Sequence, residues 1–454
     1  MEVEDLISKK FNRLTSLIFA AVLLAGTLLP FQQASAQNDP LAINASAAIL
    51  VEASTGKILY GKNIDEQLPI ASMAKVMTEY LVLEAVNEGR LNWDQTYTPS
   101  NYVYRISQNR GLSNVPLRED GTYQARELFD AMAIYSANGA AIGLAEMVSG
   151  SETNFVKEMN EKAKELGLTQ YKFVNATGLD NKDLLGVHPE GTDPDGENTV
   201  SARDMAILSS AIVTDFPEIL ETASTSRKVF REGTDDAIKM DNWNWMLPGL
   251  LFETEGVDGL KTGSTKSAGS SFTSTAERNG MRVVTVVMNA KDDKGSLHTP
   301  RFNETKKLLD YAYNNFTVEE LFPQNYQDEA QTSVTVDKGK QKTVELETKT
   351  AYTMAVKRGE KENYQPKFQI NEDKLNDNGD IAAPVEKGEA LGYMTVEYTG
   401  GDTDYGFLSN SSDTQLVAKE SVEKANWFVL SMRGVTGFFG GLWNNTVGAI
   451  KGLF

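Results

Sequence analysis

The chain lacks cysteine altogether and has only two histidines among its 454 residues. Without cysteine it can form no disulfide, no thiolate nucleophile and no Cys-based metal site. A Ser-His-Asp triad or a multi-histidine zinc site would have to use His188 and His298, which both lie near prolines in polar, loop-like stretches. The sequence therefore predicts no metal site, and it shows no cofactor site.

Basic residues are outnumbered as well. The chain has 44 Lys and Arg against 63 Asp and Glu, which gives a formal net charge of -19. Proteins that bind nucleic acid need clustered Lys and Arg to displace counterions from the phosphates. The acidic balance therefore argues against DNA or RNA as a partner.

An apolar run near the N-terminus is typical of an export signal. Two lysines and an arginine within residues 9–13 precede the apolar residues 17–29, and Ala34-Ser35-Ala36 follows as a small-residue cleavage site. The alternative is an uncleaved membrane helix, but the run is shorter than the roughly 20 apolar residues of a full span. We predict that residues 1–36 are a signal peptide and that the mature protein is exported.

The length exceeds what one hydrophobic core usually serves, so we expect at least two domains. Residues 38–315 form the first, with strand patterns at both ends and helical patterns between them. The expected strands are 47–53, 57–60, 257–262, 270–276 and 281–288, with tight turns at Ser54-Thr55-Gly56 and Asn279-Gly280. The expected helices are one from Ser72 to about Gly89, then 126–135, 139–148, 152–166, 201–213 and 304–313. We predict a sheet built from both ends of the segment, with helices packed around it.

The rest of the chain has a different character. Residues 316–416 show short alternating runs separated by Gly, Asn, Asp and Lys, which predicts a small β-rich domain. In residues 420–454 apolar side chains follow helical spacing, with Trp427 and Trp443 on or beside the apolar stripe. Since Trp and Phe anchor well at a membrane interface, we expect an amphipathic helix on the membrane surface. The alternative is a helix packed on the core of the second domain.

Ser72 and Lys75 form the first chemical motif. They are three residues apart at a predicted helix start, so one turn brings the amine within hydrogen-bond reach of the hydroxyl. The partial positive charge of the helix N-terminus favours the neutral, basic form of Lys75. The pair predicts an activated serine nucleophile, although Ser-x-x-Lys alone also occurs by chance in exposed helices.

Two further motifs follow in order. Ser136 and Asn138 stand in a break between two helices, where the hydroxyl could relay a proton and the amide could bind a substrate amide; helix capping is the alternative. Lys261-Thr262-Gly263 ends a predicted edge strand, where Gly permits close approach of a ligand backbone and Lys supplies positive charge; a simple turn is the alternative. The ordered set of three, in an exported chain, indicates a catalytic cleft.

This set resembles the motifs of penicillin-binding proteins and class A β-lactamases. The chain resembles in particular the low-mass D-alanyl-D-alanine carboxypeptidases of serine peptidase family S11. The matching segments are Ser72-Met73-Ala74-Lys75, Ser136-Ala137-Asn138, Asp258-Gly259-Leu260-Lys261-Thr262-Gly263 and Arg301-Phe302-Asn303-Glu304. The resemblance implies an α/β fold: a DD-peptidase/β-lactamase-like domain with an antiparallel sheet, flanking helices and a helical subdomain, then an all-β domain and the C-terminal helix. It also implies a place at the extracytoplasmic face of a bacterial membrane.

The resemblance implies a role for each residue of the first two motifs. Ser72 would attack the penultimate D-Ala carbonyl of a peptidoglycan stem peptide, with Lys75 as general base. Ser136 would pass a proton to the leaving amine, and Asn138 would bind the peptide amide. Many relatives have Gly where this chain has Ala137, and the added methyl is expected to adjust the loop without abolishing activity.

The third motif would hold the substrate. The backbone N–H groups of the nucleophile and of Ser264 would form the oxyanion hole. Lys261, Thr262 and Gly263 would line the substrate, with Lys261 and Thr262 facing its terminal carboxylate. Arg301 matches the carboxylate-binding arginine of the family, and the alternative is an ordinary surface residue. Because β-lactams mimic the D-Ala-D-Ala end, they should acylate the nucleophile.

Two other readings stay open. A class A β-lactamase shares the acyl chemistry but needs a dedicated carboxylate for fast deacylation, and the acidic residues within 180–197 do not exclude one. The second domain and the tail argue against it. A non-catalytic envelope scaffold would keep only a penicillin-binding cleft and use its β-rich domain to bind partners.

Overall fold

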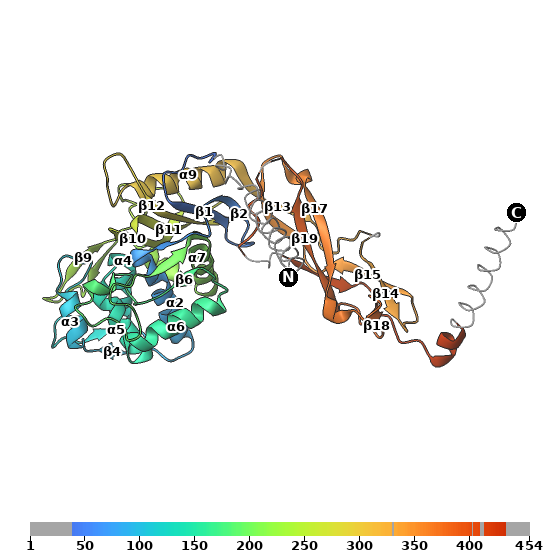
Figure 1. Cartoon of the computed structure of the whole chain (residues 1–454), viewed down its shortest axis with the longest axis horizontal. Helices are drawn as coiled ribbons and strands as arrows, with labels where there is room; N and C mark the ends of the chain where they lie inside the picture. The colour runs from blue at the N-terminus through green and yellow to red at the C-terminus, as the bar shows by residue number, and fades with distance from the viewer. Residues whose placement is uncertain (1–38, 329–330, 402, 409–412, 433–454) are drawn as a thin grey trace, which may run out of the picture. The chain divides into compact units, whose positions relative to one another are not determined.

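A computed structural model describes residues 39–328, 331–401, 403–408 and 413–432 of the chain. The predicted signal peptide (1–36) and residues 433–454 of the predicted terminal helix lie outside the described residues. Two regions of different architecture follow one another along the chain (Figure 1), a mixed α/β region and a β-rich region.

The α/β region is built on a five-stranded antiparallel sheet with the order β10-β11-β12-β1-β2. Its strands are β1 (Ala47–Glu52), β2 (Ile58–Lys62), β10 (Val257–Thr265), β11 (Gly269–Arg278) and β12 (Met281–Ala290). Ala47 pairs with Met288, so the two ends of the region meet within one sheet, as predicted. Asn279 and Gly280 have φ values of 52° and 75°, the positive values that a two-residue hairpin turn requires.

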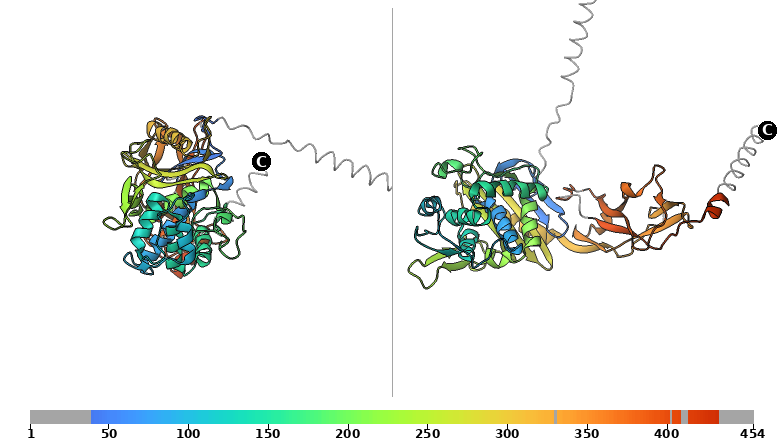
Figure 2. Two further views of the ribbon diagram at one scale, coloured as in Figure 1. Left: turned by 90° about the vertical axis from the view of Figure 1, so that its left-hand side faces the viewer. Right: turned by 90° about the horizontal axis from the view of Figure 1, so that it is seen from below.

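Helices cover both faces of this sheet (Figure 1; Figure 2, left). The helix α9 (Pro300–Asn315) packs on β11 and β12 from one side. The helix α7 (Ala202–Asp215) packs on β1, β11 and β12 from the other. All six residues of β1 are buried as a result.

The helical part of the region centres on α2 (Lys75–Asn87), in which ten of 13 residues are buried. The helices η1 (Ala71–Ala74), α4 (Ala125–Tyr135), α5 (Asn138–Ser149) and α6 (Glu152–Glu165) pack on α2. The region also contains α3 (Asn101–Ser107), η2 (Asn181–Asp183) and α8 (Ile219–Ala223). A helix that is buried on nearly every side is the core element of its domain. The predicted helix at Ser72 is confirmed with one refinement: Ser72 lies in the 3-10 turn η1, and the α-helix begins at Lys75.

Short strands complete the region. β3 (Gln67–Pro69), β7 (Thr199–Ser201) and β6 (Tyr171–Lys172) form one small sheet; β4 (Thr96–Tyr97) pairs with β5 (Tyr123–Gln124), and β8 (Arg227–Phe230) with β9 (Ile238–Asp241). β3 leads directly into η1, and β6 stands just before the segment that contacts α2. The small sheet of β3, β7 and β6 therefore ties the segment before η1 to the segment that contacts α2.

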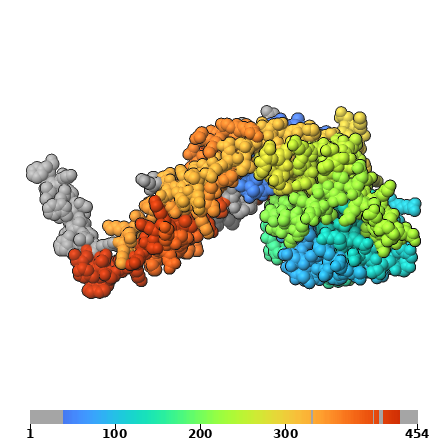
Figure 3. Space-filling model, turned by 180° about the vertical axis from the view of Figure 1, so that it is seen from behind, coloured from blue at the N-terminus to red at the C-terminus, as the bar shows by residue number. Residues whose placement is uncertain are grey.

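The β-rich region confirms the predicted change of character. β13 (Phe316–Phe322) pairs with β16 (Tyr352–Lys357), and a six-stranded sheet has the order β17-β19-β20-β15-β14-β18. Its members are β14 (Ser333–Asp337), β15 (Thr343–Thr348), β17 (Tyr364–Ile370), β18 (Ile381–Ala382), β19 (Ala390–Tyr398) and β20 (Thr414–Ala418), with short turns η3 (Lys361–Asn363) and η4 (Glu372–Lys374). Residues Leu346, Met354 and Leu391 belong to its core. In Figure 3 this region is a continuous lobe in orange to red.

The last described residues correct the start of the predicted terminal helix. Val422 is buried and bridges to Val385, so residues 420–425 complete the β-rich region rather than a helix. Helical structure begins at Trp427, which is 77% exposed and is followed by the exposed Phe428. Within the described part of the chain, no helix combines the length and the apolar character that crossing a membrane requires.

Candidate active site

Ser72 and Lys75 lie side by side where η1 passes into α2. Lys75 Nζ is 3.2 Å from Ser72 Oγ, 2.7 Å from Asn138 Oδ1 and 2.6 Å from the backbone oxygen of Thr177. A neutral amine has two N–H groups and one lone pair. When the N–H groups donate to Asn138 and Thr177, the lone pair faces the hydroxyl of Ser72. The geometry therefore suits Lys75 to accept the proton of Ser72.

The environment of Lys75 favours the neutral amine. Its side chain is fully buried, and burial lowers its pKa well below the ordinary value. The charge of Lys261 lowers this pKa further, whereas Glu79 acts in the opposite direction. The direction matches the sequence prediction, but the leading cause is burial inside the domain rather than the helix N-terminus.

Ser136 and Asn138 lie where α4 ends and α5 begins. Ser136 caps α4 with a φ of 60°, and Asn138 is the first residue of α5. Asn138 Nδ2 donates to the backbone oxygen of Ser113 at 3.0 Å, which holds the amide group in place. Ser136 Oγ is buried and has no hydrogen-bond partner among the described residues, which suits a proton relay. Ala137 has a φ of -61°, so its methyl group adds no backbone strain.

The edge strand β10 carries the third motif along the same cleft. Thr262 and Ser264 line the cleft, and Lys261 is buried behind them. Burial lowers the pKa of Lys261 to about 8, while the carboxyl group of Glu79 opposes this shift and the charge of Arg301 adds to it. An amine with this pKa still carries a positive charge at neutral pH.

Two glycines allow the chain to pass close to the nucleophile. A Cβ on Gly263 would lie 2.4 Å from the backbone oxygen of Ile70, so β10 packs directly against the residue before η1. The close neighbour of Gly263 is thus the protein's own backbone, and the approach of a ligand backbone to Gly263 stays a prediction. A Cβ on Gly178 would lie 1.9 Å from the backbone oxygen of Ala71, and Gly178 has a φ of +81°.

Arg301, the second residue of α9, is 1% exposed and reaches the end of β10. Its Nη1 donates to the backbone oxygens of Gly263 and Ser271, its Nη2 to Ser264 Oγ and the Leu297 oxygen, and its Nε to Ser270 Oγ and the His298 oxygen. All five N–H groups therefore have protein acceptors. Burial lowers its pKa to about 9. Arg301 is not an ordinary surface residue; it fixes the end of β10 and places its charge behind Ser264.

A cleft of about 540 Å³ brings the motifs together. The predicted site residues that line it are Ser72, Ser136, Asn138, Thr262, Ser264 and Arg301. Lys75, Lys261 and Gly263 lie just behind this surface. Part of the wall is aromatic and consists of Tyr135, Trp243, Trp245, His298 and Phe302. The ring of His298 stacks on Trp243, with 5.9 Å between ring centroids, so this histidine belongs to the wall.

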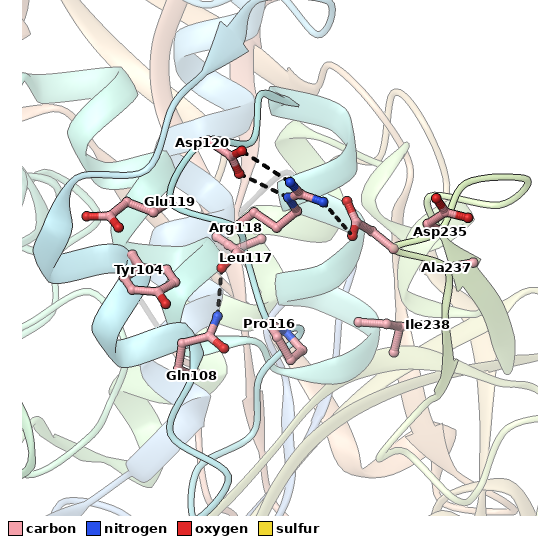
Figure 4. Close-up of a pocket in the computed structure, with 11 residues that line it drawn as sticks. Tyr104, Gln108, Pro116, Leu117, Arg118, Glu119, Asp120, Asp235, Ala237 and Ile238 are labelled. Atoms are coloured by element: carbon pink, nitrogen blue, oxygen red, sulfur yellow. Dashed lines mark hydrogen bonds and ion pairs between the residues drawn. The ribbon is translucent and has the colours of Figure 1, made fainter.

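A second pocket, of about 610 Å³, lies between α3 and the β8–β9 hairpin (Figure 4). Figure 4 shows Arg118 beside Asp120. The nitrogen to oxygen distances from Arg118 are 3.0 Å to Asp120 and 3.9 Å to Asp236. Gln108 donates to the backbone oxygen of Leu117. Among the described residues around this pocket there is no predicted site residue, so the chemistry places the active site in the first cleft.

Sequence reasoning missed the segment 175–179. Asn175 is fully buried, and its Oδ1 accepts hydrogen bonds from the N–H groups of Thr177 and Gly178. This turn aims the Thr177 oxygen at Lys75. The signal for it is Asn175-Ala176-Thr177-Gly178, a turn-forming run with glycine last. The aromatic residues Trp243 and Trp245 were also missed.

The fold and the cleft define a class: a serine hydrolase with a lysine beside the serine. The chain belongs to the Peptidase S11 family, described as D-alanyl-D-alanine carboxypeptidase, which matches residues 32–292. Residues 316–424 match the family described as Penicillin-binding protein 5, C-terminal domain.

Individual relatives agree with the family over most of the chain. The D-alanyl-D-alanine carboxypeptidase DacF of Bacillus subtilis is 32% identical over 421 residues, which cover 92% of this chain and 97% of the relative. A solved structure of a peptidoglycan synthesis regulatory factor (PBP3) from Streptococcus pneumoniae is 33% identical, with a TM-score of 0.66 and coverage of 84% and 99%. Penicillin binding protein 5 from Haemophilus influenzae is 26% identical, with a TM-score of 0.65 and coverage of 84% and 98%. The similarity extends through both regions of the chain.

Proposed function

We propose that this D-alanyl-D-alanine carboxypeptidase removes the terminal D-alanine from peptidoglycan stem pentapeptides through an acyl-enzyme on Ser72. The observation that carries the proposal is the distance of 3.2 Å between Ser72 Oγ and the Nζ atom of the buried Lys75. A serine hydroxyl is a weak nucleophile until a base takes its proton. Lys75 is held in place to do this by Asn138 and Thr177.

In the first step, the hydroxyl proton of Ser72 moves to Lys75 while Oγ bonds to the penultimate D-Ala carbonyl carbon. The electrons of the C=O bond move to the oxygen, which the backbone N–H groups of Ser72 and Ser264 stabilise, each by about 3 to 4 kcal/mol. The C–N bond then breaks, and the leaving amine receives the proton through Ser136. Water hydrolyses the acyl-enzyme in the second step.

The substrate's C-terminal carboxylate would lie at the end of β10. Thr262 and Ser264 line the cleft there, and Lys261 and Arg301 supply positive charge from behind them. Since the N–H groups of Arg301 are engaged, we assign the direct contacts to the two hydroxyl groups and the longer-range attraction to the two cations. Asn138 would bind the peptide amide with its remaining N–H.

β-Lactam antibiotics carry a carboxylate and a reactive amide carbonyl, so they would acylate Ser72 in the same way. The class A β-lactamase reading loses support, because among the described residues that line the cleft there is no Asp or Glu to activate a deacylating water. Penicillin should therefore be released slowly.

The location and the division of the chain are part of the proposal. Export through a signal peptide at residues 1–36 would place the catalytic domain (38–315) and the β-rich domain (316–416) outside the cytoplasm. The amphipathic segment within 420–454 would bind the membrane surface. The strong exposure of Trp427 and Phe428 supports this anchoring role.

The test is D-alanine release from a diacylated Lys-D-Ala-D-Ala tripeptide by the purified full-length protein. Ser72→Ala should abolish both release and covalent penicillin labelling. Ser210→Ala is the matched control, since Ser210 lies on α7, is not among the residues that line the cleft, and its buried Oγ has no partner among the described residues. Labelling at Ser72 without D-alanine release would favour the penicillin-binding scaffold instead.

A further inference from the structure

A buried carboxyl group that belongs to none of the three motifs lies behind the cleft. Glu79 stands four residues after Lys75 on α2, so both side chains are on the same face of the helix, one turn apart. Glu79 is 2% exposed, and its Oε1 atom has no hydrogen-bond partner among the described residues. A buried carboxylate without hydrogen bonds is costly, so its charge must be compensated by nearby cations.

Two lysines act on this carboxyl group through their charges. Lys75 comes from the same helix, and Lys261 comes from β10, which packs against α2. Arg301 of α9 acts in turn on Lys261. Carboxylates of the other helices packed on α2 are bound elsewhere: Asp130 of α4 to Lys228, Glu152 of α6 to the Ala176 N–H, and Asp204 of α7 to the Gln170 N–H. Glu146 of α5 accepts from the Tyr97 hydroxyl.

We propose that Glu79 is a positioning residue of the reaction, whose carboxylate balances the two lysines so that Lys75 is a neutral base while Lys261 stays protonated. The inference rests on the proposed function, which gives these roles to the two lysines. One carboxylate, one ammonium group and one neutral amine leave the buried cluster without net charge. Without Glu79, two amines would share one desolvated site with no anion, and neither would hold a proton well.

Glu79 does not exchange the proton itself. When Ser72 Oγ bonds to the carbonyl carbon, the hydroxyl proton moves to the lone pair of Lys75 and the carbonyl electrons move to the oxyanion. The new ammonium group then faces Lys261, and the charge of Glu79 offsets their repulsion. The proton leaves with the departing amine nitrogen through Ser136, which restores neutral Lys75.

The arrangement holds above about pH 7, where the carboxyl group of Glu79 is mostly ionised. Burial raises the pKa of Glu79 to about 7, although both lysines oppose the rise. Glu79 in turn opposes the burial effect that lowers the pKa of Lys75 and of Lys261. Removing the carboxylate therefore lowers both lysine pKa values further. The acylation rate falls on the acid side of its pH profile, where Lys75 is protonated, and on the alkaline side, where Lys261 loses its charge. Both limbs of the profile therefore move to lower pH.

The test is the pH dependence of the second-order rate constant for acylation by a fluorescent penicillin, measured on the full chain. In Glu79→Gln both limbs should move toward acid by about one pH unit or more. In Glu79→Asp, which keeps the charge, they should stay close to the wild-type positions. Asp204→Asn is the matched control, because it removes another buried carboxyl group with an unpartnered oxygen among the described residues, and it should leave both limbs in place.

The proposal would be overturned if Glu79→Gln lowered the acylation rate constant but left both limbs of the pH profile at their wild-type positions. It would also be overturned if Glu79→Asp shifted the limbs as far as Glu79→Gln does. If Glu79→Gln does not fold, Glu79→Met removes the same charge without an amide group to satisfy and is judged in the same way. D-Alanine release is measured separately. Wild-type protein that is acylated without releasing D-alanine overturns the proposed function and leaves the Glu79 test readable, whereas wild type that is not acylated overturns both.

Discussion

Replacing Gly178 by alanine would disturb the nucleophile from a residue that has no chemistry of its own. The added Cβ would lie 1.9 Å from the Ala71 oxygen and 2.8 Å from the Ser72 nitrogen. Both are backbone atoms, so no side-chain rotation relieves the contact. Since real contacts of this kind stay above 3.0 Å, either the turn 175–179 or η1 must move by about 1 Å.

The expected effect on rate is large compared with the effect on stability. A displacement of about 1 Å at a reacting group costs roughly 100-fold in rate. The positive φ of Gly178 costs an alanine roughly 1–2 kcal/mol, and overpacking adds about 1–3 kcal/mol. Gly178→Ala should therefore fold with a lower melting temperature and react with fluorescent penicillin about 100-fold more slowly.

Gly186 provides the matched control, because it has a φ of +77° and its added Cβ would meet nothing within 4 Å among the residues that the structure describes. Gly186→Ala should show only the backbone cost in thermal unfolding and an unchanged acylation rate. If Gly178→Ala reacted as fast as Gly186→Ala, the close contact with η1 would not position Ser72, and the reasoning would be refuted.

Three further predictions concern individual side chains. Lys75→Met should slow acylation by fluorescent penicillin by about 10²–10⁴-fold, the usual contribution of a general base, while Lys62→Met, which changes a lysine of β2, should react normally in the same assay. Arg301→Lys keeps a charge but loses the hydrogen bonds to Gly263 and Ser264, so both the melting temperature and the acylation rate should fall; wild-type values would mean that charge alone matters. Burial raises the pKa of Glu152 to about 7, above its value in the unfolded chain, so its stabilising effect is complete below about pH 4.5 and is lost as the pH rises through about 7. The free energy of unfolding of Glu152→Gln, measured in urea, should lack this decrease with rising pH. An identical pH dependence of that free energy in Glu152→Gln and wild type would contradict the raised pKa of Glu152.

Much of the fold was predictable because its signals are local. The turn at Asn279-Gly280 needs positive φ values that its own residues supply, and the helical spacing after Ser72 follows from neighbours within a few turns. The three motifs were recognisable for the same reason, since each occupies one short segment. The start of the terminal helix was misplaced, because the burial of Val422 depends on its bridge to the distant Val385.

The sequence by itself determined which residue types are available for chemistry and in what order: a serine and a lysine at a helix start, a polar break, and an edge strand with Lys261, in a chain without cysteine. Only the tertiary structure decided how they work. It placed the Thr177 oxygen against Lys75, engaged every N–H group of Arg301, and buried Glu79 with two lysines. These properties depend on separate segments meeting in one core, such as Lys75 and Thr177, which are 102 residues apart. Desolvation in that core, rather than local pattern, sets the charge of each group.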